Sequence, residues 1–277
     1  MSIKSFGREL LSQFPMMDGL FRRFIWSRFH FPEVEMRFLN DLPAGSIDIA
    51  IDVGAAMGSY SWILNRVAKQ VYSFEPGKIH NRYLNRVVFG TNIIVIRAAC
   101  GSVSGKVSMY TPGSDSNARH SATLSQSNPV ISYSDTSVDQ VDQVVVDAFV
   151  AEKLSTNRSI DLLKVDVEGY ELEVFKGSLE MLSKHHPLIV CEIEARHNAN
   201  YAEVFGLLKK IGYSCYIYRA GTFESLPCER IEDLQSEDDL KFRLGNNYNP
   251  TSNNYINNFV FQHPLSRIKV KNEASTK

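Results

Sequence analysis

From Ile47 onward, short apolar runs alternate with amphipathic stretches along the chain. Apolar runs of strand length occupy residues 47–53, 71–74, 92–98, 160–165, 188–193, 213–218 and 256–262. A polar, helix-like segment begins at Lys78. In three other stretches between the runs, apolar side chains recur at helical spacing: Tyr60, Ile63, Leu64 and Val67; Leu172, Phe175, Leu179 and Leu182; and Tyr201, Val204, Phe205, Leu208 and Ile211. Helices with such stripes cover a sheet face. The alternation is typical of βαβ units and predicts an α/β fold with a mostly parallel sheet.

Two polar stretches interrupt this alternation. Residues 111–137 are rich in Ser, Asn and Asp, and the runs on either side, 106–110 and 143–146, resemble paired strands. Residues 228–254 are charged and then rich in asparagine. Long loops in compact domains are usually functional lids or disordered segments. Each stretch is therefore a candidate wall of a substrate pocket, with a disordered segment as the alternative.

The ends of the chain suggest a division into residues 1–40, 41–264 and 265–277. The first is predicted to be a helical extension. On a helical wheel the apolar residues around Phe24 fall on one side and the arginines on the other, except that Arg28 falls within the apolar arc. Packing on the domain or on a second subunit of a homo-oligomer is one interpretation, and peripheral membrane contact is the other. The second part is the main domain, and the tail is expected to be solvated and disordered.

Composition narrows the class of protein. The 277 residues are 44% hydrophobic and 22% charged, as in soluble globular proteins, and a net charge of -1 argues against a nucleic-acid partner. The four cysteines form no CxxC pair, which favours buried free thiols in a reducing compartment. No apolar run has the length of a membrane span. The N-terminal segment does not resemble a signal peptide, because polar residues interrupt the apolar core that a signal peptide needs. We therefore expect a cytoplasmic protein, with a peripheral position at the inner membrane as the alternative.

A glycine turn follows the first predicted strand. Residues 51–61 read IDVGAAMGSYS and lead into the first amphipathic helix. Glycines at such a turn let the backbone approach a ligand closely. Because the spacing is DxGxxxG and not GxGxxG, a nicotinamide or flavin dinucleotide is disfavoured.

Two acidic motifs come at the ends of later strands. Glu75 lies in the sequence SFEP, about twenty residues beyond the glycine turn, where a carboxylate can accept both hydroxyls of a ribose. The second motif is DLLKVDVEG at residues 161–169, in which Lys164 and Asp166 project to the same side of the strand and Glu168 follows. Charged groups at such a strand end are costly unless they are paired or used. The motifs together predict a nucleoside site beside a reactive strand end, with a purely structural Lys164–Asp166 pair as the alternative.

With these motifs, the sequence resembles the FkbM-type family of S-adenosylmethionine-dependent O-methyltransferases. The resemblance covers roughly residues 47–218 and rests on DVGA, FEP, AACG at 98–101, KVDVEGYELEVFKG at 164–177 and CEI at 191–193. It implies a three-layer Rossmann-like class I fold whose seven-stranded sheet has an antiparallel last strand. It also implies S-adenosyl-L-methionine as cofactor, held by Asp52, Gly54, Ala55, Gly58, Tyr60, Ser61, Glu75, Pro76, Ala98, Ala99 and Gly101.

Three positions depart from the family pattern. Ala56 stands where the family commonly has Asn, and Ser102 where it often has an acidic residue. The family's Thr-Leu-Asp before the middle helix is Val-Val-Asp here, so that Asp147 can still serve as a helix N-cap. None of these changes removes a residue that must react.

Methyl transfer to a hydroxyl needs the acceptor oxygen to be aligned with the methyl group, and it needs a base that takes the hydroxyl proton. The candidates are Asp166 or Glu168 as base or hydroxyl acceptor, Lys164 to tune them, and Glu192 to bind the substrate, although a structural role for Glu192 is equally consistent. His120 and His197 are weaker candidates, because loop histidines are usually just solvated. The carboxylates could be drawn as a magnesium site, but no ligand-spacing motif supports a metal.

Three functions are consistent with these motifs. The first is O-methylation of a sugar hydroxyl in a polysaccharide, glycolipid or related glycoside, and the second is O-methylation of a small secondary metabolite. The third is a non-catalytic S-adenosylmethionine-binding protein, against which the intact Lys164, Asp166 and Glu168 argue.

Overall fold

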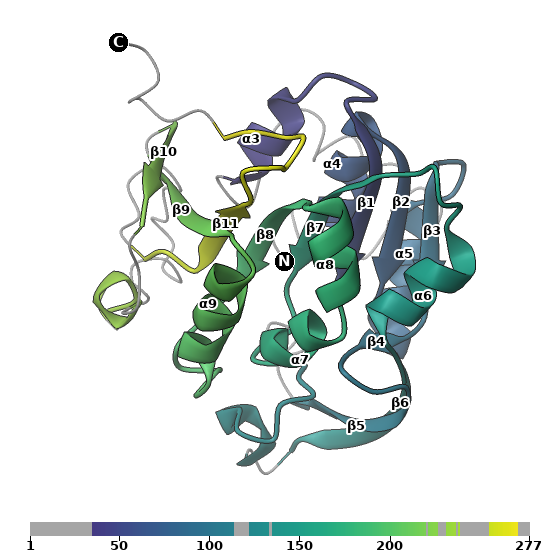
Figure 1. The fold of residues 1–277 in the computed structure, drawn as a ribbon. Helices are drawn as coiled ribbons and strands as arrows, with labels where there is room; N and C mark the ends of the chain where they lie inside the picture. The colour runs from purple at the N-terminus through teal and green to yellow at the C-terminus, as the bar shows by residue number, and fades with distance from the viewer. Residues whose placement is uncertain are drawn as a thin grey trace, which may run out of the picture.

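The computed structural model describes residues 35–113, 122–132, 135–219, 221–226, 231–236, 238 and 255–270. In these residues, eight strands form a main sheet in the order β10-β9-β11-β8-β7-β1-β2-β3 (Figure 1). They are β1 (Ile47–Val53), β2 (Ala68–Phe74), β3 (Ile93–Ile96), β7 (Ile160–Val165), β8 (Leu188–Glu192), β9 (Ser214–Arg219), β10 (Thr222–Ser225) and β11 (Asn258–Gln262). β1 pairs in parallel with β2 and β7, β2 with β3, and β7 with β8, whereas β11 is antiparallel to β8 and β9. The predicted mostly parallel Rossmann-like sheet with an antiparallel last strand is confirmed.

The eighth strand, β10, is an addition to the seven that were expected. It pairs antiparallel with β9 at the edge of the sheet. Phe223 of β10 is buried and packs edge-on against Phe38, with 4.8 Å between ring centroids. Burial of this aromatic side chain holds the short strand on the sheet.

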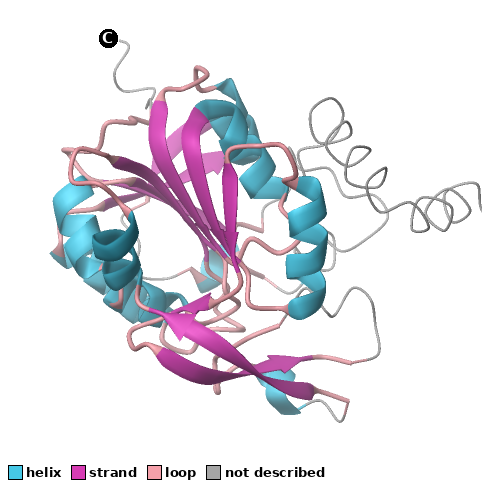
Figure 2. Ribbon diagram, turned by 90° about the vertical axis from the view of Figure 1, so that its right-hand side faces the viewer, coloured by secondary structure: helices cyan, strands magenta, loops and turns pink. Residues whose placement is uncertain are grey.

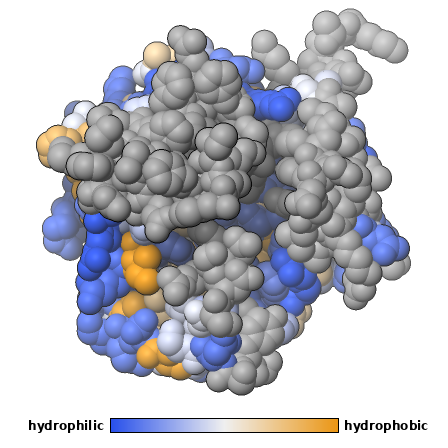
Figure 3. Space-filling model, turned by 180° about the vertical axis from the view of Figure 1, so that it is seen from behind, coloured by the Kyte–Doolittle hydropathy of each residue, from blue (hydrophilic) through white to orange (hydrophobic). Residues whose placement is uncertain are grey.

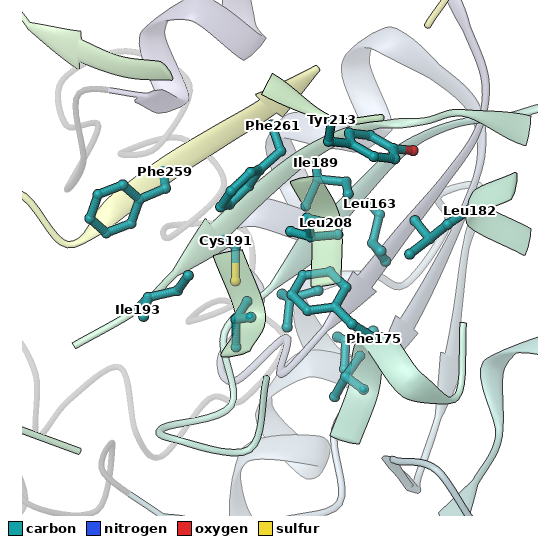
Figure 4. Close-up of a cluster of buried hydrophobic side chains, with 14 of the residues drawn as sticks. Leu163, Phe175, Leu182, Ile189, Cys191, Ile193, Leu208, Tyr213, Phe259 and Phe261 are labelled. Atoms are coloured by element: carbon teal, nitrogen blue, oxygen red, sulfur yellow. The ribbon is translucent and has the colours of Figure 1, made fainter. Parts of the chain in front are cut away.

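Helices cover both faces of the main sheet (Figure 1). One face carries α3 (Glu35–Asp41), α4 (Ser59–Val67) and α5 (Lys78–Val87), and the other carries α6 (Val146–Lys153), α7 (Glu171–Lys176), α8 (Leu179–His185) and α9 (Tyr201–Lys210). Figure 4 shows part of the hydrophobic core between the sheet and helices α6 to α9, where Phe175 and Leu208 meet the strand residues Leu163 and Ile189. The three layers therefore bury apolar side chains on each side of one sheet.

The stripe from Leu172 to Leu182, expected as a single helix, is divided into α7 and α8. The break falls at Gly177, where an added Cβ would lie 2.1 Å from the carbonyl oxygen of Gly101. Asp147 lies in the first turn of α6 and does not cap it. Its carboxylate instead accepts the backbone N–H groups of Glu180 and Met181, at 3.0 and 2.8 Å, and so caps the start of α8.

A smaller sheet lies across the end of the main sheet at which the parallel strands finish (Figure 2). It consists of β4 (Ala99–Cys100), β6 (Ser137–Val144) and β5 (Gly105–Thr111), in that order, with β5 and β6 antiparallel. An antiparallel pair forms there, but residues 106–110 pair with 138–142 and not with the expected run 143–146, because Val146 already begins α6. The second strand instead begins at Ser137, the last residue of the polar stretch. The structure also contains two short 3-10 helices, η2 (Pro129–Ser132) and η3 (Glu232–Leu234).

Both ends of the described chain belong to the domain. Met36 and Leu39 of α3 are buried in the core, although residues up to 40 were assigned to an extension. In residues 265–270, which were expected to be a solvated and disordered tail, Ser266, Ile268 and Val270 are buried, whereas Leu265 is exposed. Arg267 binds both carboxylate oxygens of buried Asp161, at 3.1 and 2.9 Å, and Ile268 is buried beside it. The predicted amphipathic helix, Cys228, most of residues 228–254 and the last seven residues lie outside the described part.

The described surface is mainly hydrophilic on the face seen in Figure 3, with scattered hydrophobic patches. Large exposed hydrophobic side chains of the described residues are Ile79, Phe89, Ile94, Val103, Ile131, Val138 and Leu265. No helix within the described ranges is long and apolar enough to cross a membrane.

Candidate active site

A cavity of about 280 Å³ lies at the carboxyl ends of the central parallel strands. Its lining follows the order of the strands: Ala98 comes after β3, Glu75 after β2, Gly54 after β1, Asp166 after β7, and Glu192 ends β8. From the sequence we expect the cofactor on the side with Gly54, Glu75 and Ala98, which we call the cofactor half. The side with Asp166, Glu168 and Glu192, where we expect the acceptor, is the acceptor half. Ligands of open α/β sheets bind at this edge.

The glycine turn after β1 adopts a conformation that larger residues resist. Gly54 has φ of +82°, and a Cβ added there would lie 1.7 Å from the carbonyl oxygen of Asp166. The N–H groups of Gly54 and Ala55 both donate to the carbonyl of Phe74, each at 3.0 Å. Gly54 therefore lets three chain segments meet at the floor of the cavity.

Glu75 is fixed by the main chain. Its Oε2 accepts the N–H of Ala56 at 2.9 Å, and its Oε1 accepts the N–H of Gly77 at 2.7 Å. Burial raises the pKa of this carboxyl to about 7, and the two N–H donors oppose the rise. Each carboxylate oxygen can accept more than one hydrogen bond, so that Glu75 can still receive hydroxyl donors from a ligand.

The cofactor half includes only some of the residues named from the sequence. Gly54, Glu75, Pro76, Ala98 and Ala99 line the cavity, and Ala56, Phe74, His80, Cys100 and Met109 join them. Ala55, Gly58, Tyr60, Ser61, Asp52 and Gly101 lie outside its lining. Their contacts with a cofactor stay predictions, and some of them support the turn from below.

Asp52 is such a support. It is buried, and its carboxylate accepts a hydrogen bond of 2.5 Å from Ser61, whose hydroxyl lies 2.8 Å from that of Ser73. Burial raises the pKa of Asp52 to about 6, against the effect of Ser61 and of the Lys164 ammonium. This network ties β1, α4 and β2 together below the turn.

Lys164 is completely buried and does not line the cavity. Its ammonium lies 3.6 Å from a carboxylate oxygen of Asp166 and 4.6 Å from the centre of the Tyr60 ring. Asp166 does line the cavity, and 29% of its side chain is exposed. Lys164 therefore acts from behind the cavity lining, through the positive charge it places beside Asp166.

The acceptor half is rich in carboxylates. Asp166, Glu168 and Glu192 line it. Asn257, which directly precedes β11, donates hydrogen bonds to Glu192 and to Glu194, the latter at 3.1 Å. Burial raises the pKa of Glu168, while His197 opposes the rise. Polar groups that converge on a cavity in this way suit recognition of a polar acceptor.

His197 is only a weaker candidate from the sequence, and Glu194 and Asn257 are not among the candidates. The Nδ1 atom of His197 lies 2.7 Å from Oε2 of Glu168 and 3.6 Å from Oε2 of Glu194. The available signal was the alternation in CEIEARH, which places Glu194 on the same side as Glu192 just before His197. His120 lies outside the described residues. Among the described residues, no group of three or more His, Cys, Asp or Glu side chains could hold a metal ion.

The model of the methyltransferase FkbM domain family matches residues 52–215 of the sequence. The chain belongs to this family. The match includes the glycine turn, Glu75, the end of β7 and the end of β8. It identifies the domain as an S-adenosylmethionine-dependent methyltransferase domain, and the site fits that cofactor, because Gly54 leaves room for close approach and Glu75 presents a buried carboxylate to the cavity.

Several known structures are weakly similar to this FkbM domain. Methyltransferase FkbM from Methylobacillus flagellatus KT is 16% identical with a TM-score of 0.46, over 80% of this chain and 45% of that one. An rRNA methylase from Streptococcus thermophilus is 12% identical with a TM-score of 0.41, over 83% and 93%. A candidate methyltransferase from Streptococcus mutans, in complex with SAH, is 10% identical with a TM-score of 0.42, over 82% and 94%. The chain thus spans less than half of the first of these proteins. A search of curated proteins found no match.

Proposed function

We propose that this FkbM domain methylates a hydroxyl oxygen of a sugar in a polysaccharide, glycolipid or related glycoside. The supporting observation is the set of three carboxylates, Asp166, Glu168 and Glu192, along the acceptor half. Carboxylates accept hydrogen bonds from hydroxyl groups, and a sugar offers several neighbouring hydroxyls to such a surface. The same negative charges repel a phosphate backbone, which favours a glycoside over a nucleic acid.

The residues of the two halves have different tasks in this reaction. When bound, S-adenosylmethionine supplies an electrophilic methyl group. Gly54 and Glu75 hold the cofactor, while Asp166 and Glu168 orient the acceptor hydroxyl by hydrogen bonds. Lys164 balances the charge of Asp166 from below. Alignment of acceptor and methyl group is the chief source of rate in such a displacement, and a nearby base assists loss of the hydroxyl proton.

The proposal is tested by incubating the protein with S-adenosylmethionine labelled in its methyl group and with fractionated glycans, glycolipids and small metabolites. Label should appear in glycans or glycolipids as a methyl ether that survives mild alkali. Alkali-labile label would indicate a carboxyl methyl ester, and label confined to metabolites, protein or nucleic acid would overturn the glycoside assignment. Cofactor binding without transfer to any fraction would indicate a non-catalytic binding protein.

Peripheral membrane contact through the N-terminal segment and homo-oligomerisation remain predictions. Because residues 35–41 belong to the core, the informative truncation removes only residues 1–34. Loss of liposome association in this variant, with cofactor binding retained, would support a lipid-linked acceptor. Unchanged association would count against it.

A further inference from the structure

The loop between β8 and α9 places a histidine against the acceptor half. His197 is 9% exposed, and its Nδ1 atom lies 2.7 Å from Oε2 of Glu168. A neutral imidazole that donates from Nδ1 to a carboxylate leaves Nε2 as a hydrogen-bond acceptor. Among the described residues, none forms a hydrogen bond with Nε2. The pair thus has the polarity of a base that is oriented by a carboxylate.

The backbone of Glu168 is held in place from outside its own segment. Glu168 has φ of +52°, a conformation that is costly for a residue with a side chain. Its carbonyl oxygen accepts hydrogen bonds from Thr123 Oγ1 at 2.7 Å and from Asn128 Nδ2 at 2.9 Å. The strained backbone therefore fixes the direction of the Glu168 side chain, and the loop before β6 stabilises this conformation.

The histidine loop is fitted to the same turn. Gly169 has φ of +96°, and a Cβ added there would lie 2.3 Å from the carbonyl oxygen of His197. Glu171, which is buried, accepts the N–H of Gly169 at 2.9 Å and the side-chain amide of Asn198 at 2.6 Å. Contacts on both sides of His197 therefore fix its distance from Glu168.

Glu168 lines the cavity, whereas His197 lies outside that lining. Asp166, Glu168 and Glu192 line the cavity and also a narrow cleft that His197 shares. The imidazole is thus next to the surface that we assign to the acceptor. Glu194, Arg196, Asp166, Glu171 and Glu192 are the other charged groups that face the pair. Most of them are carboxylates.

We propose that His197 is the general base of the reaction and that Glu168 is its positioning residue, an assignment that rests on the proposed O-methylation. The acceptor oxygen forms its bond to the methyl carbon as the bond from that carbon to sulfur breaks. The sulfur keeps the bonding electron pair and loses its positive charge, while the hydroxyl proton passes to Nε2 of His197. Glu168 stabilises the resulting imidazolium, which then releases the proton to water.

The test is the His197→Asn variant, whose amide can still donate to Glu168 but offers no base at the position of Nε2. We expect kcat at neutral pH to fall about 100-fold or more, with the Kd for S-adenosylhomocysteine changed less than about twofold in calorimetry. The rise of kcat with pH that a histidine base causes should disappear. Unchanged kcat and pH profile in a folded variant would overturn the assignment.

Two further variants separate the alternatives. Glu168→Gln should lower kcat about 10-fold, and in NMR titrations of the protein without cofactor the His197 ring should take up its proton at lower pH than in the unaltered protein. His186→Asn is the matched control: His186 precedes β8 at the opposite end of the sheet, has φ of +48° that Asn tolerates, and should leave kcat unchanged. No NMR shift in Glu168→Gln would overturn the pairing whether or not a hydroxyl acceptor is found. Failure of the unaltered protein to methylate any hydroxyl would instead reject the proposed function.

Discussion

The cofactor half of the cavity is built mainly from main-chain contacts, whereas the acceptor half is built from side chains of distant segments. Glu75 is held by the N–H groups of Ala56 and Gly77, which are 19 and 2 residues away. Glu168 meets His197 across 29 residues, and Glu192 meets Asn257 across 65. Backbone donors are present whatever the side chains are, so the cofactor half can tolerate sequence change around a few glycines and acids. The acceptor half depends on side-chain identity at several places at once, as a surface selective for one substrate should.

The strongest way to break both halves together is Gly54→Ala. The new Cβ would collide with the carbonyl of Asp166, and the positive φ alone costs about 1–3 kcal/mol. We expect a loss of stability greater than that and loss of cofactor binding, measured by urea denaturation and calorimetry. Gly90→Ala is the control, because Gly90 has φ of +73° but no atom within 4 Å of an added Cβ. Equal losses in the two variants would show that the close approach is unimportant.

Asp166→Asn should affect the acceptor half while sparing the cofactor half. The amide removes the negative charge beside buried Lys164 and weakens binding of a hydroxyl donor. We expect kcat to fall about 100-fold with the affinity for S-adenosylhomocysteine retained. Steady-state kinetics and calorimetry on the same preparation measure both. A loss of affinity as large as the loss of kcat would place Asp166 in the cofactor half instead.

Glu75→Gln should give the opposite result. The amide nitrogen of Gln would face either Ala56 or Gly77, and thus oppose one donor with another. We expect the Kd for S-adenosylhomocysteine to rise about 10-fold to 100-fold, and kcat at saturating cofactor to change much less. Asp166→Asn serves as the comparison. If kcat falls and affinity does not, the division of the cavity into two halves is incorrect.

The smallest effect concerns stability against pH, where a buried carboxyl of the cofactor half and one beside the acceptor half should behave alike. Burial raises the pKa of Glu75 and of Glu171 to about 7 each, above the ordinary value of 4.5. Between these values the folded protein holds protons that the unfolded chain has released, so that the free energy of unfolding falls as pH rises from about 4.5 to about 7.

Replacement of one of these carboxyls should reduce that fall. In Glu171→Gln we expect a decrease with pH that is smaller by roughly 1–3 kcal/mol, from urea denaturation at several pH values. Glu152→Gln, at an exposed position, should leave the slope unchanged. An unchanged slope in Glu171→Gln would show that this carboxyl titrates normally in the folded protein.

The sequence predicts features that depend on local spacing, but not those that depend on contacts between remote segments. Strand and helix spacing predicted the core of the sheet, and residues 160–165 coincide with β7. The stripe of Leu172 to Leu182 could not reveal the break at Gly177, because the break depends on the approach of Gly101 from another part of the chain. Likewise Ile268 is buried in a cluster of side chains from remote segments, and the adjacent Arg267 meets Asp161, 106 residues away.

Local residue order by itself determined the alternation of strands and helices, the glycine turn and the acidic strand end at Glu75. Each of these depends on backbone conformation and on spacing of a few neighbouring positions, which a sequence displays directly. Only the tertiary structure decided that Lys164 is buried below the cavity, that Asp52 and Ser61 lie outside its lining, and that His197 meets Glu168. Those outcomes depend on burial and on contacts between remote segments, and both arise only when the layers pack.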